Sequence, residues 1–255
     1  MKTVADLAVD TCDRAIFSPE DGAPFQAHLA PGNPKVVLVT GSNASGKSVF
    51  FRVLAALAKD DANATGITLS IRERTGSGTY EMAAMRRAMM YGEEHEQSTG
   101  ACSVHTVEKG FKNARRMAEE GQAVVLMLDE PEMGLSEDYA AAMGQWLATQ
   151  SQEMTHANQL GLVVVTHSRP LVKGLVDALG ESPTFVNTDA PQSVGQWLAQ
   201  VPKRTVEDLL ALDKLGTTRW RAMKDFINAR PARRAKEEAE AAESAPTKPA
   251  PRPRR

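Results

Sequence analysis

Residues 36–48 carry the residue types and the spacing of a phosphate-binding loop. They read Val-Val-Leu-Val-Thr-Gly-Ser-Asn-Ala-Ser-Gly-Lys-Ser, an apolar run followed by G-x-x-x-x-G-K-S. In such a loop the backbone N–H groups surround the β- and γ-phosphates, the lysine ammonium lies between them, and the hydroxyl binds Mg²⁺. The alternative is a glycine-rich turn that matches by chance. We expect a nucleoside triphosphate to bind Gly41, Ser42, Asn43, Ala44, Ser45, Gly46, Lys47, Ser48 and Val49, with Lys47 also catalytic.

Two neighbouring carboxylates follow a second apolar run, at residues 124–128. Ligands of an open parallel sheet bind beyond the carboxyl ends of its strands, which is where Asp129 and Glu130 would lie. Asp129 is suited to bind Mg²⁺ together with Ser48, and Glu130 is suited to polarise an attacking water as general base. The alternative interpretation is an acidic strand end whose carboxylates are only solvated.

Alternating strand and helix patterns predict an α/β fold, namely a P-loop NTPase with a mainly parallel sheet covered by helices on both faces. Turn residues before position 36 favour a hairpin or two, which would form a small antiparallel N-terminal portion. We expect strands at 36–40, 67–72, 123–128, 162–166 and 185–187, and helices at 48–59, 80–91, 103–120, 137–152 and 206–229, with a polar loop at 93–100. The expected domains are an ATPase domain at 1–190, a helical extension at 191–230 and a disordered tail at 231–255.

Composition limits the class of protein. Of the 255 residues, 42% are hydrophobic, which is enough for a sizeable core. The net charge of −2 means that the chain lacks the global basic field of a strong nucleic-acid binder. From residue 231 onward, however, the sequence contains seven Lys and Arg residues but only four Glu residues, so this end of the chain is basic. The two cysteines form no metal or redox motif, and no apolar run approaches the ~20 residues of a membrane span. We expect a cytoplasmic protein without membrane insertion.

Beyond the phosphate loop, the order of three motifs resembles that of the ABC-type ATPases. The motifs are Leu-Asp-Glu-Pro at 128–131, Gly-Leu-Ser at 134–136 and Val-Val-Val-Thr-His at 163–167. The resemblance implies that Asp129 binds magnesium, Glu130 is the catalytic base, residues 134–136 signal across a dimer, and His167 contacts the γ-phosphate. A histidine at a strand end is otherwise more often structural.

The family also has a signature loop, which reaches the nucleotide of the partner subunit. The best match here is Gln-Ser-Thr-Gly-Ala at 97–101, which assigns that role to Ser98, Thr99 and Gly100. The match is partial because the family's paired glycines are reduced to Gly100. The alternative is that Ser98 or Ser103 only caps the helix that follows.

The resemblance covers residues 14–190 and is closest to the soluble ATPases of DNA repair and chromosome maintenance, including the MutS type. Transporter subunits carry a glutamine-bearing loop after the phosphate loop, and no glutamine occurs between Lys47 and Glu96. The resemblance implies an ATP-dependent dimer of this chain with itself or with a related ATPase. Three uses stay open: a nucleic-acid transaction, a switch controlling an effector protein, and a transporter subunit. No residue that would distinguish ATP from GTP is evident, although Phe17 or Phe25 could stack on a purine.

Overall fold

The computed structural model describes residues 2–18, 22–70, 98–229 and 231. Its centre is a six-stranded sheet in the order β1-β6-β2-β5-β4-β3. Every neighbouring pair runs parallel except β1 and β6, which are antiparallel, so the predicted mainly parallel α/β fold is confirmed. The strands are β1 His28–Ala30, β2 Asn33–Thr40, β3 Thr65–Ser70, β4 Val124–Asp129, β5 Gln159–Val165 and β6 Pro183–Asn187.

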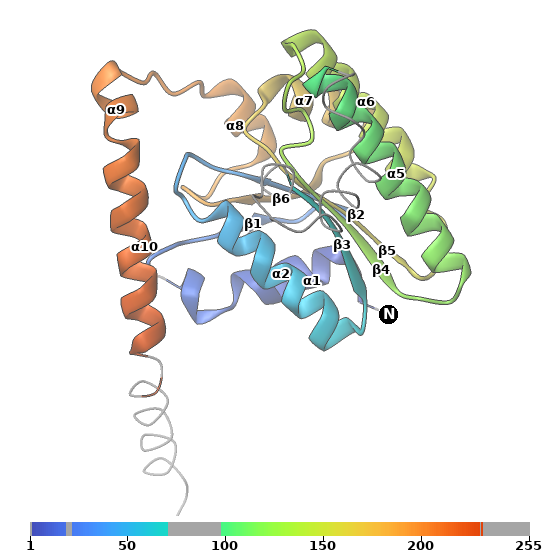
Figure 1. Cartoon of the computed structure of the whole chain (residues 1–255), viewed down its shortest axis with the longest axis horizontal. Coiled ribbons are helices and arrows are strands. Elements are labelled where there is room, and N and C mark those ends of the chain that lie inside the picture. Colours follow the sequence, from blue (N-terminus) through green and yellow to red (C-terminus); the bar gives the residue numbers. More distant parts are fainter. Residues whose placement is uncertain (1, 19–21, 71–97, 230, 232–255) are drawn as a thin grey trace, which may run out of the picture.

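Helices cover both faces of the sheet (Figure 1). One face packs against α1 Val4–Cys12 and α2 Lys47–Ala62, and the other packs against α5 Thr99–Glu119, α6 Glu137–Gln152 and α7 Arg169–Leu179. The central strands carry continuous apolar runs, Val36–Val39 in β2, Val124–Leu128 in β4 and Leu162–Val165 in β5, and both faces of these runs are buried. The sheet therefore separates two hydrophobic clusters, and the carboxyl ends of β2, β4 and β5 lie at the same edge.

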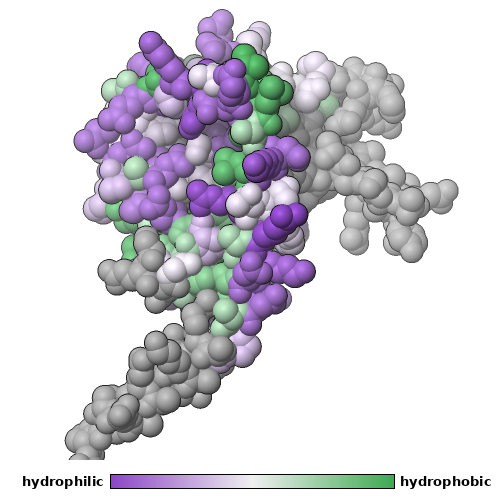
Figure 2. Space-filling view, turned by 90° about the vertical axis from the view of Figure 1, so that its left-hand side faces the viewer, coloured by the Kyte–Doolittle hydropathy of each residue, from purple (hydrophilic) through white to green (hydrophobic). Residues whose placement is uncertain are grey.

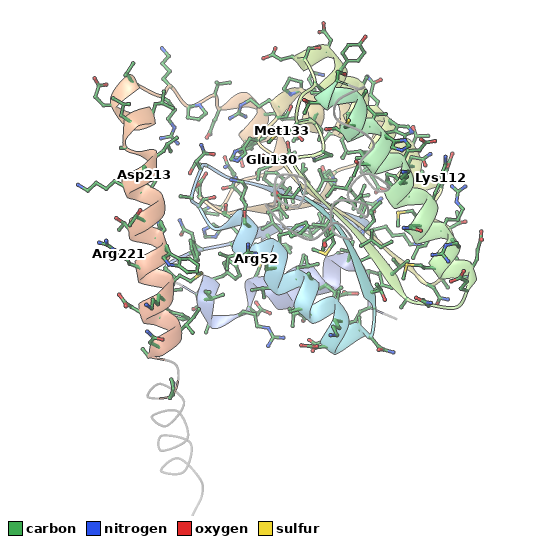
Figure 3. All side chains as sticks on the ribbon, in the orientation of Figure 1. Arg52, Lys112, Glu130, Met133, Asp213 and Arg221 are labelled. Atoms are coloured by element: carbon green, nitrogen blue, oxygen red, sulfur yellow. The ribbon has the colours of Figure 1, made fainter. Side chains whose placement is uncertain are left out.

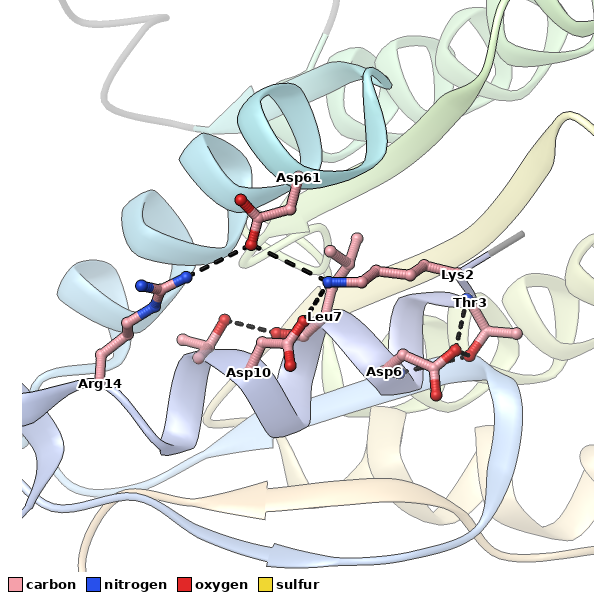
Figure 4. Close-up of polar contacts among 8 residues, drawn as sticks. Lys2, Thr3, Asp6, Leu7, Asp10, Arg14 and Asp61 are labelled. Atoms are coloured by element: carbon pink, nitrogen blue, oxygen red, sulfur yellow. Dashed lines mark hydrogen bonds and ion pairs between the residues drawn. The ribbon is translucent and has the colours of Figure 1, made fainter. Parts of the chain in front are cut away.

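The N-terminal segment is a helix rather than the expected hairpins. A capping box formed by Thr3 and Asp6 starts α1, and the helix buries its Val4, Leu7, Ala8 and Thr11 side. Ion pairs then join α1 to the end of α2: Lys2 contacts Asp10 and Asp61, and Arg14 contacts Asp61 (Figure 4). The antiparallel portion is β1 alone, which pairs with β6 and not with β2.

A close helix–helix contact holds α6 and α7 together. A Cβ added at Gly144 of α6 would lie 2.0 Å from the backbone oxygen of Leu171, and one at Gly174 of α7 would lie 2.2 Å from the backbone oxygen of Ala141. Glycine at these two positions lets the two backbones touch. The sequence analysis did not anticipate α7, although Ser168 caps it and Gly180 ends it in the left-handed conformation.

Three helices follow the last strand. In α8 Val194–Ala199, Val194 and Trp197 are buried, and the Arg169 guanidinium lies 4.2 Å from the centre of the Trp197 ring. Neither α9 Val206–Leu210 nor α10 Leu212–Asn228 has a buried residue, and α10 stands beside the α/β body (Figure 1). Seen from that side, apolar groups lie interspersed among hydrophilic ones (Figure 2). The exposed large hydrophobic residues of this segment are Val201, Val206, Leu209, Leu210, Leu215, Trp220 and Ile227.

Several expectations lie outside the described residues: the helix at 80–91, the loop at 93–97, residues 71–72 of the expected strand and the tail from 232 onward. The division into domains at 190 and 230 stays a prediction. Within the described residues, no helix is long and apolar enough to cross a membrane.

Candidate nucleotide-binding site

The loop at residues 41–46 joins the end of β2 to the start of α2. Three of its residues have positive φ: Gly41 at 151°, Ala44 at 62° and Gly46 at 106°. Any side chain at Gly41 would also collide with Thr188, whose Oγ1 would lie 2.1 Å from the added Cβ. At Gly46 the added Cβ would lie 2.6 Å from the Phe25 ring. The two glycines of the motif are therefore required both by backbone conformation and by close packing.

Residues just beyond β6 hold this loop in place. The carboxylate of Asp189 accepts hydrogen bonds from the backbone N–H of Ser42 at 2.6 Å and from its hydroxyl at 2.7 Å. The hydroxyls of Ser45 and Thr188 lie 2.5 Å apart. The sequence analysis missed Thr188 and Asp189 because nothing local marks them: they lie more than 140 residues from their partners. They preorganise the loop through a buried contact between Thr188 and Ser45 and exposed contacts between Asp189 and Ser42.

Lys47 is buried inside the loop that it follows. Its Nζ donates to the backbone oxygens of Gly41 at 3.0 Å and Ser42 at 2.8 Å. The N-cap of α2 is Gly46, which has no side chain to cover the first turn of the helix. A helix N-terminus beside a lysine ammonium favours an anion, and phosphate is the anion such a loop accommodates.

The carboxylates of Asp129 and Glu130 lie at the end of β4, and β5 lies between β4 and β2 in the sheet. Glu130 takes up a left-handed conformation with φ 53°, and its N–H donates to the backbone oxygen of Val165 at 2.8 Å. That conformation is strained for glutamate, which is typical of side chains positioned for function. One Glu130 oxygen lies 3.4 Å from Nε2 of His167, just beyond the end of β5 (Figure 3 labels Glu130).

The histidine is neutral over most of the pH range. Burial, and then the positive charge of Lys47, lower the pKa of His167 to about 4. Near neutral pH it can therefore donate or accept a hydrogen bond without carrying charge. The negative charge of a phosphate placed nearby would raise that pKa again.

A third acid, Glu132, was not anticipated. Its Oε1 accepts a hydrogen bond of 2.5 Å from the hydroxyl of Thr166, which in turn accepts one of 2.8 Å from the N–H of Ser168. Its Oε2 is buried and has no hydrogen-bond partner within the described part of the chain. Burial is the main reason that the pKa of Glu132 is raised. This contact ties the acidic loop after β4 to the segment that carries His167.

The phosphate-binding loop, the carboxylates at the end of β4 and His167 surround one cavity of about 470 Å³. Of the residues predicted from the sequence, those that line it are Asn43, Ala44, Gly46, Lys47, Ser48, Val49, Asp129, Glu130 and His167. Gly41, Ser42 and Ser45 belong to the loop but are not among the lining residues. Residues that the sequence analysis did not place here complete the wall: Phe25, Arg52, Gly216, Arg219, Trp220 and Met223.

The donor set suits magnesium bound together with a nucleotide. Ser48 and Asp129, the predicted metal ligands, line the same cavity and offer a hydroxyl and a carboxylate, the oxygen donors that Mg²⁺ prefers. Among the described residues, no group of three or more His, Cys, Asp and Glu side chains could hold a metal ion. Mg²⁺ in nucleotide sites usually takes its remaining ligands from phosphate and water, so two protein ligands are sufficient.

The predicted signature residues lie apart from the cavity lining. Helix α5 begins at Thr99 and not at Ser103, so Thr99 and Gly100 lie in the helix and not in the expected loop. Ser98 caps it, accepting a hydrogen bond of 3.3 Å from the N–H of Ala101. The first turn packs on the loop after Glu130: a Cβ added at Gly100 would lie 2.7 Å from the backbone oxygen of Gly134, and the Ser103 hydroxyl donates to the Met133 oxygen at 2.7 Å. A role across a dimer stays a prediction.

Comparisons with known proteins do not place the chain in a family. No protein-family model matches it, and neither does any curated protein. Among solved structures, it is similar to the crystal structure of Cdc6p from Pyrobaculum aerophilum, with 18% identity and a TM-score of 0.33. The match covers 58% of this chain and 38% of that one, so the chain spans well under half the length of Cdc6p. Because a likeness this low says nothing about function, the proposals below rest on the geometry of the site.

Proposed function

We propose that this chain is an ABC-type ATPase that binds Mg-ATP and hydrolyses it. The observation that carries the proposal is the convergence of four groups on one cavity: the first turn of α2 with Lys47, the Mg²⁺ donors Ser48 and Asp129, the carboxylate of Glu130, and His167. They come from three separate parts of the chain: the start of α2, the end of β4 and the residues just beyond β5. Together they supply what phosphoryl transfer to water requires, namely held phosphates, a cation site and a group that orients water.

Each residue has a distinct task in this mechanism. Lys47 exchanges its two backbone oxygen partners for phosphate oxygens, and the N-terminus of α2 stabilises the same charge. Ser48 and Asp129 would hold Mg²⁺, which when bound would supply positive charge beside the phosphate oxygens. Glu130 accepts a hydrogen bond from the attacking water and takes its proton. Neutral His167, 3.4 Å from Glu130, is placed to donate a hydrogen bond to the γ-phosphate.

We further propose that the site is completed by a second subunit, which presents Ser98, Thr99 and Gly100 to the γ-phosphate. Two features support this arrangement. These residues start a 21-residue helix, whose N-terminus favours an anion, and they do not line the cavity of their own chain. A monomer would then lack donors that stabilise the transition state.

Mixing two inactive variants tests the shared site. Lys47→Ala removes the phosphate ligand of its own cavity. Ser98→Asp keeps a good helix cap but sets a negative charge against the partner's γ-phosphate. A mixed dimer has one intact site, so ATP hydrolysis should reappear on mixing, and wild-type turnover per subunit should rise with protein concentration. Full activity in Ser98→Asp alone, or turnover independent of concentration, would contradict the shared site.

The process served by hydrolysis is proposed to be a nucleic-acid transaction, on the strength of the resemblance to DNA-repair ATPases. Adding single- or double-stranded DNA to the same assay should raise turnover at least several-fold. Turnover that is indifferent to DNA but still depends on both subunits would move the proposal to a dimerising switch that controls a protein partner.

A further inference from the structure

The outer wall of the nucleotide cavity is formed by α10, a helix outside the part of the chain that resembles ATPases. Gly216, Arg219, Trp220 and Met223 line the cavity opposite the start of α2. Positions three or four apart lie on one face of a helix, so a single side of α10 faces the site. More than 160 residues of sequence separate this wall from the phosphate-binding loop.

Two contacts hold α10 in this position. Met223 packs against the hydrophobic cluster that contains Phe25, and a guanidinium nitrogen of Arg219 donates to the backbone oxygen of Pro24 at 2.5 Å. The Arg219 contact reaches the segment just before β1, which also lines the cavity through Phe25. Helix and segment thus form one side of the cavity together.

The cavity lining combines charged and apolar side chains. Lys47, Ser48, Asp129 and Glu130, with Arg52 and Arg219, supply charged and hydroxyl groups, while Phe25, Trp220 and Met223 supply the large apolar surfaces. A nucleoside triphosphate also combines the two, since its phosphates are charged and its base is a flat, largely apolar ring. Aromatic side chains bind bases by stacking, and tryptophan offers the largest face.

Among the described aromatic residues near the site, Trp220 is the most exposed. Phe17 is 2% exposed and packs edge-on against Phe50, with ring centres 5.5 Å apart. Phe25 is 6% exposed and lies against Gly46. Trp220 is 59% exposed although it lines the cavity, and Gly216, one turn before it, adds no side chain that would cover the indole.

We propose that the indole of Trp220 stacks on the base of the bound nucleotide, with Met223 and Phe25 at the edge of the ring. This inference rests on the proposed function, because it assumes that the phosphates occupy the loop at 41–48. It makes α10 a nucleotide-binding element of the same chain. Stacking depends on the flat face of the base and not on its hydrogen-bonding edge, so it would strengthen the binding of both ATP and GTP.

The test compares two ligands that differ in the base. Equilibrium affinities for ATP and for inorganic tripolyphosphate are measured with Mg²⁺ present, for the wild type, Trp220→Ala, Trp220→Phe and Arg221→Ala. Arg221 follows Trp220 on α10 but lies on the opposite side of the helix and is not among the lining residues, so it is the matched control (Figure 3 labels it). Lys47→Ala marks the loss expected when the phosphate site itself fails.

The expected result is ATP affinity about tenfold to a hundredfold weaker in Trp220→Ala, the range given by base–aromatic stacking, with the affinity for tripolyphosphate unchanged. Trp220→Phe should retain most of the ATP affinity, and Arg221→Ala should match the wild type. Unchanged ATP affinity in Trp220→Ala would overturn the proposal. An equal loss for both ligands would also overturn it, because α10 would then support the phosphate site and not the base. If wild-type protein binds neither ligand, the proposed function fails and this inference fails with it.

Discussion

The contact between Gly41 and Thr188 gives a quantitative test of how the phosphate-binding loop is held. Substituting Gly41→Ala forces a side chain onto a residue with φ of 151°, a conformation that costs on the order of 1–2 kcal/mol for a residue other than glycine. The new Cβ would lie 2.1 Å from Oγ1 of Thr188, so that hydroxyl must move by more than 1 Å to reach an ordinary 3.4 Å contact. Moving it breaks the 2.5 Å contact with Ser45, a loss of about 1 kcal/mol.

The expected total is about 2–3 kcal/mol of lost stability, equivalent to a fall in Tm of roughly 4–12 °C for a chain of this size. Urea unfolding of four proteins measures it: the wild type, Gly41→Ala, Thr188→Ala and the double variant. Removing Oγ1 relieves the shorter of two close approaches, the other being 2.6 Å to the Ser45 hydroxyl, so Gly41→Ala should cost about 1 kcal/mol less in the Thr188→Ala background. Strict additivity of the two substitutions, to within about 0.5 kcal/mol, would refute this account of the loop.

Three further predictions concern other parts of the fold. Because burial holds the pKa of His167 near 4, against 6.5 in the unfolded chain, its contribution to stability is complete above pH 6.5 and is lost as pH falls towards 4. Replacing it by asparagine should therefore flatten the stability measured across that interval, and an unchanged profile would contradict the assigned pKa. Gly144→Ala should lower stability by about 2–3 kcal/mol, because the new Cβ meets a backbone oxygen that cannot move independently of α7; a loss below 0.5 kcal/mol in thermal unfolding would argue against the contact. Arg169→Ala should cost about 1 kcal/mol by removing the stacking on Trp197, whereas Lys173→Ala, at an exposed ion pair on the same helix, should cost less than half as much.

The sheet and most of its helices could be predicted because their signals are local. Strands β2, β4 and β5 are continuous apolar runs, and each ends in residues of a recognisable type: the glycine-rich loop, Asp129 with Glu130, and His167. Their common edge then follows from parallel pairing. Helix α1 was missed although its signals are present, because the turn residues that follow it outweighed the capping box at Thr3 and the helical spacing of its apolar residues.

The remainder of the site depends on contacts between distant segments, which no local pattern reveals. Asp189 holds Ser42 across 147 residues, and Thr166 reaches Glu132 across 34. The role of α10 could not be predicted for the same reason: its amphipathic pattern marks one face for contact but does not reveal that this face lines the same cavity as the first turn of α2. Phe17 and Phe25, suggested as stacking residues from their type alone, are both largely buried, and of the two only Phe25 lines the cavity.

The central claim, that Glu130 activates water against a nucleotide held by Lys47, is tested most directly by one comparison. ATP binding and steady-state ATP hydrolysis are measured for Glu130→Gln beside the wild type, at equal protein concentration and with Mg²⁺. Glutamine keeps the size of the side chain but cannot take a proton, so ATP should still bind while hydrolysis falls by about 10²–10⁴-fold. Hydrolysis that continues at the wild-type rate in Glu130→Gln would contradict the proposed mechanism.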